Sequence, residues 1–170
     1  MRRAHQGDLE AIVAIYNATV HSRMATADTE PVSMASRQAW FDHHTDTRPV
    51  LVEERHGEIA GWLSFEPFYG GRPAYHRTAE LSIYIHERYR GQGVGAHMLH
   101  HAIDMAPRLG VVNLLATIFS HNTASLRLFE KFGFARWGEL PDVAEMDGAR
   151  YSVAIHGLNL DAGHGSPGSC

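Results

Sequence analysis

Three glycines within six residues, in the segment RGQGVG at 90–95, separate a predicted β-strand from a predicted α-helix. The segment before them, 78–86, alternates apolar and polar residues, which is typical of a half-buried strand. The segment after them carries apolar residues on one helical stripe and ends at Pro107 and Gly110. The first N–H groups of such a helix have no partner within it, and glycines let a ligand approach the backbone closely. The turn is therefore a candidate anion site, although the spacing alone is equally consistent with a sharp connection and nothing more.

Two common phosphate-binding motifs do not fit this turn. A Walker P-loop ends in Gly-Lys-Ser/Thr, whereas the turn continues as Gly95-Ala96-His97 and so lacks both the lysine and the hydroxyl. A dinucleotide fingerprint can be forced onto residues 91–96, but it needs an acidic residue at the end of the next strand. That strand ends in ATIF at 116–119, which contains no acid. The first motif is excluded, and the second is weakly supported.

The remaining sequence alternates helical and strand-like patterns, which predicts a mixed α/β fold. The expected elements are a helix from about Asp8 (a plausible N-cap), a helix at about 36–43, a hairpin at 50–54 and 59–65, a strand at 78–86, a helix after the glycine turn, a buried strand at 111–119, a helix at 122–131 and two last strands near 134–139 and 150–155. We expect one domain at 1–160 and a flexible tail at 161–170, because the tail is small and polar.

Charge and composition exclude several classes of protein. The chain has 170 residues, with 15 Lys and Arg against 19 Asp and Glu, so its net charge of −4 argues against binding to nucleic acid or an anionic membrane. No apolar run approaches the ~20 residues that cross a bilayer. The single cysteine, Cys170, fits a reducing, cytoplasmic setting.

Histidine is over-represented, with 13 residues, and raises a metal-binding module as an alternative function. His97, His100 and His101 have helical spacing that could clasp a metal ion. They share the predicted solvent face of their helix with Asp104, opposite its apolar stripe. We therefore expect no functional metal and at most adventitious zinc.

Arg90, Gly93 and Gly95, following a strand and opening a helix, resemble the acyl-CoA signature of the GNAT superfamily of N-acetyltransferases. The resemblance continues through the helix at Asn122 and KFGF at 131–134 and covers nearly the whole chain. It implies a mixed central sheet flanked by helices, with acetyl-CoA as co-substrate.

Five further segments narrow the resemblance to the phosphinothricin N-acetyltransferase branch. They are IYN at 15–17, RQAWF at 37–41, RPAY at 72–75, TAE at 78–80 and SIYI at 82–85. Members of this branch acetylate the α-amino group of phosphinothricin, methionine sulfoximine or methionine sulfone. The resemblance implies direct transfer to such a small substrate in a ternary complex, within a homodimeric protein.

The resemblance also assigns the residues that bind acetyl-CoA. The amides of the glycine turn would hold the pyrophosphate beside Arg90, and the exposed edge at Ile83–Ile85 would pair with the pantetheine amides. Asn122 and Lys131 would contact acetyl-CoA from the next helix. The full predicted set is Ile83, Tyr84, Ile85, Arg90, Gly91, Gln92, Gly93, Val94, Gly95, Ala96, Asn122 and Lys131.

A substrate amine must lose a proton before it attacks, and Glu80 is the predicted base. It lies in mid-strand and matches the presumed catalytic glutamate of the branch. Without the motif, a strand carboxylate paired with an arginine would be the more common arrangement. Arg72 and Tyr75, in the loop ahead of Glu80, match the branch pattern for substrate contacts.

Two positions depart from the family. Phe129 stands where many GNAT enzymes place a tyrosine, and some phosphinothricin enzymes a histidine, to protonate the departing thiolate. Leu81 replaces the histidine common after the glutamate, so substrate preference is open. The alternatives to a small-molecule acetyltransferase are a protein, peptide or other amine (antibiotic) N-acetyltransferase of the same fold and, more distantly, the histidine-based metal-binding module.

Overall fold

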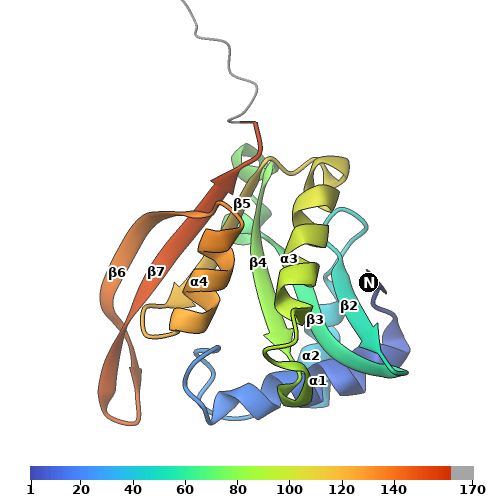
Figure 1. Ribbon diagram of the computed structural model, residues 1–170, viewed down its shortest axis with the longest axis horizontal. Helices are drawn as coiled ribbons and strands as arrows, with labels where there is room; N and C mark the ends of the chain where they lie inside the picture. Colours follow the sequence, from blue (N-terminus) through green and yellow to red (C-terminus); the bar gives the residue numbers. More distant parts are fainter. Residues whose placement is uncertain (162–170) are drawn as a thin grey trace, which may run out of the picture.

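A seven-stranded mixed sheet forms the centre of the molecule in a computed structural model that describes residues 1–161 (Figure 1). Its strand order is β1-β2-β3-β4-β5-β7-β6, and β4 and β5 are the parallel pair while the other neighbours are antiparallel. The strands are β1 (Arg2–Arg3), β2 (Val50–Arg55), β3 (Glu58–Pro67), β4 (Thr78–Ile85), β5 (Asn113–Phe119), β6 (Ala135–Met146) and β7 (Ala149–Asn159).

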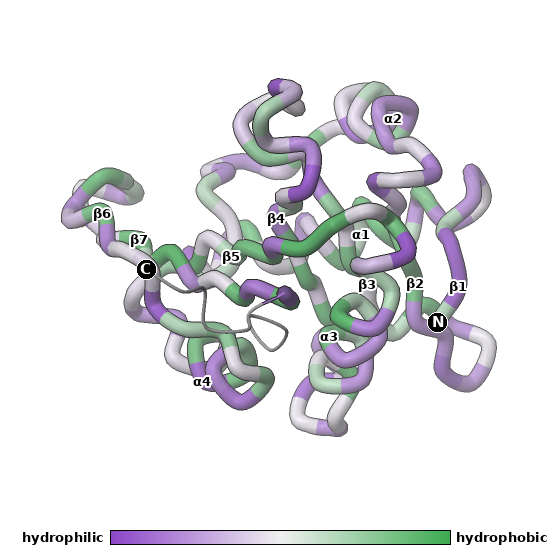
Figure 2. The backbone as a smooth tube through the Cα atoms, turned by 90° about the horizontal axis from the view of Figure 1, so that it is seen from above, coloured by the Kyte–Doolittle hydropathy of each residue, from purple (hydrophilic) through white to green (hydrophobic). Residues whose placement is uncertain are grey.

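Two pairs of helices cover the two faces of the sheet. The helices are α1 (Leu9–Val20), α2 (Met34–Asp42), α3 (Val94–Met105) and α4 (Thr123–Lys131). Seen from above, α1 and α2 lie on one side of the strands and α3 and α4 on the other (Figure 2). Within residues 1–161, no helix is long and apolar enough to span a bilayer.

The alternation predicted for the hairpin is confirmed by β2 and β3. Leu63 and Phe65 are fully buried in the larger core, with Met98 of α3. Trp62 faces the opposite way and packs with Ile12 of α1 in a second core. Burial of each such side chain contributes about 1.5–3 kcal/mol, so the strand register is fixed from both faces.

The parallel strands β4 and β5 pair over only three positions. Thr78, Ala79 and Glu80 are aligned with Asn113, Leu114 and Leu115. Beyond these positions β4 remains paired with β3, up to Ile85, while β5 pairs with β7 up to Phe119. The sheet therefore opens between β4 and β5, and the later half of β4 has one edge without a strand partner.

The structure extends or corrects several predicted elements. The last two strands reach 146 and 159, longer than predicted, because bulges at 136–138 and 140–144 break the alternation that marks a strand in the sequence. Asp8 precedes α1 but does not cap it; its carboxylate accepts from the His5 N–H at 2.8 Å and from Arg2. The two-residue strand β1 was not predicted. The predicted tail lies, apart from Asp161, outside the described residues.

Candidate active site

The glycine turn ends in an open helix N-terminus. Gly91 and Gly93 have φ angles of 72° and 79°, in the left-handed region that favours glycine. Gly93 is the N-cap of α3, and its carbonyl accepts the first intrahelical hydrogen bond, from His97 N–H at 3.0 Å. The N–H groups of residues 94–96 consequently have no acceptor within the helix, and the helix dipole favours an anion in front of them.

A cavity of about 550 Å³ runs from this turn along the open edge of β4 to the start of α4. Most of the predicted acetyl-CoA residues line it: Ile83, Tyr84, Ile85, Arg90, Gly91, Gly93, Val94, Gly95, Ala96 and Asn122. Arg90 is exposed and donates from Nε to the Ile85 carbonyl at 3.3 Å. The residues that the signature marks are therefore brought together around one elongated space.

Two predicted acetyl-CoA residues lie outside that lining. The Gln92 side chain is exposed and donates to the Arg88 carbonyl at 2.6 Å. Lys131 is the last residue of α4, whereas Asn122 precedes the first. A helix of this length separates the two by about 13 Å at 1.5 Å per residue. Contacts from these two side chains to acetyl-CoA stay predictions.

A second cavity, of about 490 Å³, adjoins the first where β4 and β5 separate. Glu80, Ser82 and Thr26 provide polar side chains in its wall, and Phe119, Leu140 and Val153 are among the apolar ones. The residues common to both cavities are Met24, Ala25, Ile83, Tyr84, Asn122 and Ser125. Two ligands, one in each cavity, would meet at this junction.

Glu80 is half-buried in the wall of the second cavity, at the end of the β4–β5 pairing. Among residues 1–161, its carboxylate has no hydrogen bond or ion pair within the usual distances. The arginine-paired arrangement is therefore not what the structure contains. A carboxylate that lines a cavity without an internal partner is available to accept a proton from a ligand.

Glu66, directly opposite Glu80 on β3, has a different environment. Its Oε1 accepts hydrogen bonds from Trp40 Nε1 at 3.0 Å and contacts His44 Nε2 at 3.1 Å. Burial alone would raise the pKa of Glu66, but the interactions with His44 and Trp40 outweigh it and lower this pKa below its usual value. Of the two facing carboxylates, Glu80 is the one without a hydrogen-bond partner among residues 1–161.

Among the described residues that line the two cavities, Glu80 is the one carboxylic acid. Phe129 is 4% exposed and packs edge-on against Phe134, with ring centroids 4.9 Å apart. Burial raises the pKa of Tyr84 far above its ordinary value, so this phenol remains protonated and is a poor proton donor at neutral pH. Its ring stacks on Trp62 at 4.5 Å and its hydroxyl donates to the Ala25 carbonyl at 3.3 Å.

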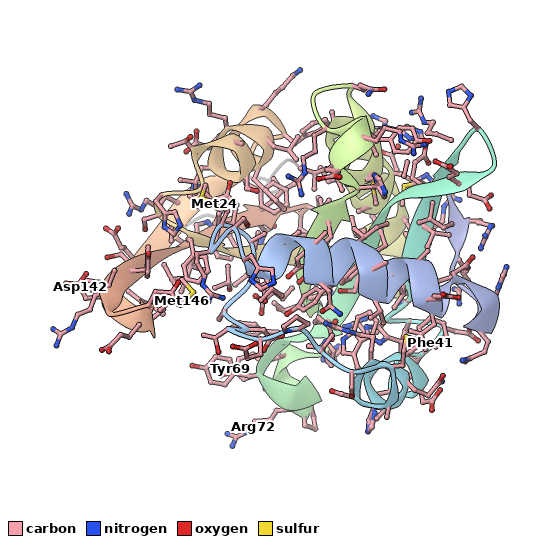
Figure 3. All side chains as sticks on the ribbon, turned by 90° about the horizontal axis from the view of Figure 1, so that it is seen from below. Met24, Phe41, Tyr69, Arg72, Asp142 and Met146 are labelled. Atoms are coloured by element: carbon pink, nitrogen blue, oxygen red, sulfur yellow. The ribbon has the colours of Figure 1, made fainter. Side chains whose placement is uncertain are left out.

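Arg72 and Tyr75 do not line either cavity. Arg72 is exposed and points away from the molecule (Figure 3). Tyr75 belongs to an aromatic cluster on the same loop, 5.4 Å from Phe68 and 5.8 Å from Tyr69 between ring centroids. Their role in substrate binding stays a prediction.

Two of the three helix histidines, His97 and His100, each lie beside an acid. His97 Nδ1 lies 3.2 Å from Glu53 Oε1, and His100 Nδ1 lies 3.3 Å from Asp104 Oδ2. In the described part of the chain, no group of three or more His, Cys, Asp or Glu side chains is arranged to hold a metal ion.

Sequence reasoning missed a segment that forms part of the wall of both cavities. Residues 24–27, in the loop between α1 and α2, line the second cavity, and two of them also line the first. Leu140 and Val143 of β6 line the second cavity as well. The sequence MATA at 24–27 carries no motif, and the contribution of β6 depends on a hairpin longer than predicted.

Comparisons with known proteins agree with this geometry. A sequence model described as the acetyltransferase (GNAT) family matches residues 12–134. A Bacillus subtilis protein named "Putative phosphinothricin acetyltransferase YwnH" is 56% identical over 94% of this chain and 98% of its own. A Pseudomonas aeruginosa L-methionine sulfoximine/L-methionine sulfone acetyltransferase is 36% identical over 98% of both chains.

The fold is likewise found in solved structures. The crystal structure of a GNAT superfamily phosphinothricin acetyltransferase from Sinorhizobium meliloti in complex with acetyl-CoA superimposes with a TM-score of 0.88. It is 26% identical, and the match covers 99% of this chain and 92% of that one. The mixed fold predicted from the sequence is confirmed.

Proposed function

Since this chain belongs to the acetyltransferase (GNAT) family, we propose that it transfers the acetyl group of acetyl-CoA to the amino group of a small, amino-acid-like substrate. The observation that carries the proposal is the junction of the two cavities at the β4–β5 opening, with Glu80 in the wall of the second cavity. Donor and acceptor would meet beside one unpaired carboxylate.

The first cavity, which runs from the glycine turn along β4, suits acetyl-CoA, which supplies an activated acyl group as a thioester. The free N–H groups at the start of α3 and the guanidinium of Arg90 would hold its pyrophosphate. The open edge of β4 at Ile83–Ile85 would pair with the pantetheine amides as an added strand does. A backbone N–H on this edge would also stabilise the oxyanion as negative charge develops on the thioester oxygen.

Glu80 would take a proton from the substrate ammonium, directly or through a water molecule. The neutral nitrogen then attacks the carbonyl carbon; a C–N bond forms and the C–S bond breaks. The nitrogen gives up its surplus proton to solvent as it becomes an amide, and the thiolate collects a proton to leave as CoA thiol. Phe129 cannot supply that proton. The modest basicity of a thiolate allows it to depart without a dedicated acid, and the proton on Glu80 is the nearest one available.

Transfer in a ternary complex is supported by the adjoining cavities and by the lack of an internal cysteine nucleophile, because the chain's single cysteine is Cys170. The second cavity, at about 490 Å³, is of a size for a single amino acid derivative. Relatives that act on methionine sulfoximine, methionine sulfone and phosphinothricin support the same substrate class.

An amine panel tests this proposal through release of CoA thiol. It should contain phosphinothricin, methionine sulfoximine, methionine sulfone, an aminoglycoside and a short peptide. Activity on the first three compounds only is expected, whereas peptide acetylation alone would overturn the substrate class. A thermal shift with acetyl-CoA but not with Zn²⁺ is the matching binding result.

We further propose that the protein is a homodimer and acts in the cytoplasm. The edge strand β6 supports the dimer, since its Trp137 is 50% exposed and lines neither cavity. The lone cysteine supports a reducing compartment. Sedimentation analysis tests the dimer, and a mass of one chain at micromolar concentration would contradict it.

A further inference from the structure

Three successive carbonyls in the loop between α1 and α2 accept hydrogen bonds from side chains across the β4–β5 opening. His121 Nε2 lies 2.8 Å from the Arg23 carbonyl, and Asn122 Nδ2 lies 2.8 Å from the Met24 carbonyl. The Tyr84 hydroxyl lies 3.3 Å from the next carbonyl, that of Ala25. The donors come from both sides of the opening, two from the end of β5 and one from β4. The loop that follows α1 lies between α4 and the β6–β7 hairpin (Figure 1).

Asn122 uses both ends of its amide within the protein. Its Oδ1 accepts from Ser125 N–H at 3.1 Å and so caps α4, while its Nδ2 binds the Met24 carbonyl. The residue is 8% exposed. Nδ2 carries two N–H groups, so one of them is engaged by the Met24 carbonyl and the other remains for a ligand.

Further contacts hold both ends of the same loop. Arg23 forms a bidentate ion pair with Asp147 in the β6–β7 turn, with N–O distances of 2.7 and 3.0 Å. Asn17 of α1 exchanges two hydrogen bonds with the backbone of Val32, at 2.9 and 3.0 Å. The three-carbonyl contact therefore begins at the anchored residue Arg23. Together with the hydrogen bond between the hydroxyls of Thr26 and Tyr16, it sets the position of the cavity wall at 24–27.

We propose that three side chains, those of His121, Asn122 and Tyr84, are positioning residues. They hold residues 24–27 in place as a wall of the second cavity, where the amine substrate would bind, and thereby determine how that substrate binds. This inference rests on the proposed function. It gives Asn122 a task toward the amine substrate, through the loop, beside the direct contact with acetyl-CoA that the family resemblance implies.

The decisive variant is Asn122→Ser, because a serine hydroxyl can still cap α4 but cannot reach and donate to the Met24 carbonyl as the amide does. We expect the KM for the amine to rise about tenfold, as the loss of one buried hydrogen bond would produce, and to rise by a larger factor than the acetyl-CoA Kd. Ser33→Ala removes a helix cap from α2, away from both cavities, and serves as the matched control.

The opposite split overturns the proposal: a weaker acetyl-CoA Kd with an unchanged amine KM makes Asn122 a direct ligand. Unchanged values for both substrates overturn it as well. If Asn122→Ser does not fold, Tyr84→Phe replaces it, since the ring can keep its stack on Trp62 and only the hydroxyl bonded to Ala25 is lost.

Hydrogen exchange separates this inference from the proposed function. In Asn122→Ser, the amides of residues 22–30 should exchange faster than in the wild type, while those of α4 are unchanged. This readout needs no substrate. If the wild type acetylates none of the panel amines but residues 22–30 still exchange faster in Asn122→Ser, the proposed substrate class fails and the positioning contact stands. If the exchange of these residues is unchanged in the variant, the positioning contact itself is rejected.

Discussion

Glu80 and Leu115 are the last residues at which β4 and β5 pair, and the sheet opens immediately beyond them. The parallel pairing holds Glu80 at a defined place, while the opening exposes the next residues of β4 to both cavities. The same break in the sheet therefore creates the space for two substrates and places a carboxylate at its boundary.

Glu80→Gln should lower kcat by about 10²–10⁴-fold at neutral pH, because the amide cannot accept the ammonium proton. The acetyl-CoA Kd should stay unchanged, since the Glu80 side chain lines the second cavity and not the first. Steady-state thiol release and calorimetry measure the two quantities. Glu145→Gln, an exposed change on β6, is the control, and wild-type turnover in Glu80→Gln would remove Glu80 from the role of base.

Gly93→Ala and Gly57→Ala form a matched pair. Both glycines have φ near +79°, and an added Cβ would meet nothing within 4 Å in either case. Each change should cost about 1 kcal/mol of folding free energy, through backbone strain. Only Gly93→Ala should also weaken acetyl-CoA binding, by about tenfold, because it moves the amides that begin α3; equal Kd values for the two variants would contradict the anion site.

Arg90→Gln should weaken acetyl-CoA binding by about three- to tenfold at low salt, with a smaller effect at high ionic strength. Arg90 lines the first cavity, at the start of α3, whereas Arg108 lies beyond the other end of α3. Arg108→Gln is therefore the control for loss of one surface charge. A salt-independent effect would mean that Arg90 acts through packing and not through its charge.

Asp8→Asn should lower the free energy of unfolding by about 1–2 kcal/mol at pH 7. The hydrogen bonds from Arg2, at 2.7 and 2.8 Å, hold the pKa of Asp8 below its ordinary value. Stability from a depressed pKa is complete above the unfolded value, about 3.9, and is lost as the pH falls through the folded value.

The difference between wild type and Asp8→Asn should therefore shrink below about pH 4 in urea titrations. Asp46→Asn removes the partner of Arg3 in an exposed ion pair, with an Asp46 side chain 97% exposed, and should cost less than about 0.5 kcal/mol. A constant difference between wild type and Asp8→Asn down to pH 2 would show that the carboxylate charge is not involved.

The sequence by itself determined the local chemistry of this protein. The predicted glycine turn contains the positive φ angles of Gly91 and Gly93. The helix predicted from 122 begins where Asn122 caps it, and Glu80 is one of the polar residues in the alternation that predicts its strand. Each of these features depends on residues within a few positions along the chain, where side-chain period and backbone preference act directly.

Only the tertiary structure decided which distant segments meet. Met24 and Asn122 are 98 residues apart, and no local pattern marks 24–27 as a cavity wall or the side chain of Tyr84 as its support. The opening after Glu80 and Leu115 is likewise set by the pairing of whole strands and by the helices packed on both faces. Contacts of this kind arise from the summed packing of many residues, which periodicity within one segment does not encode.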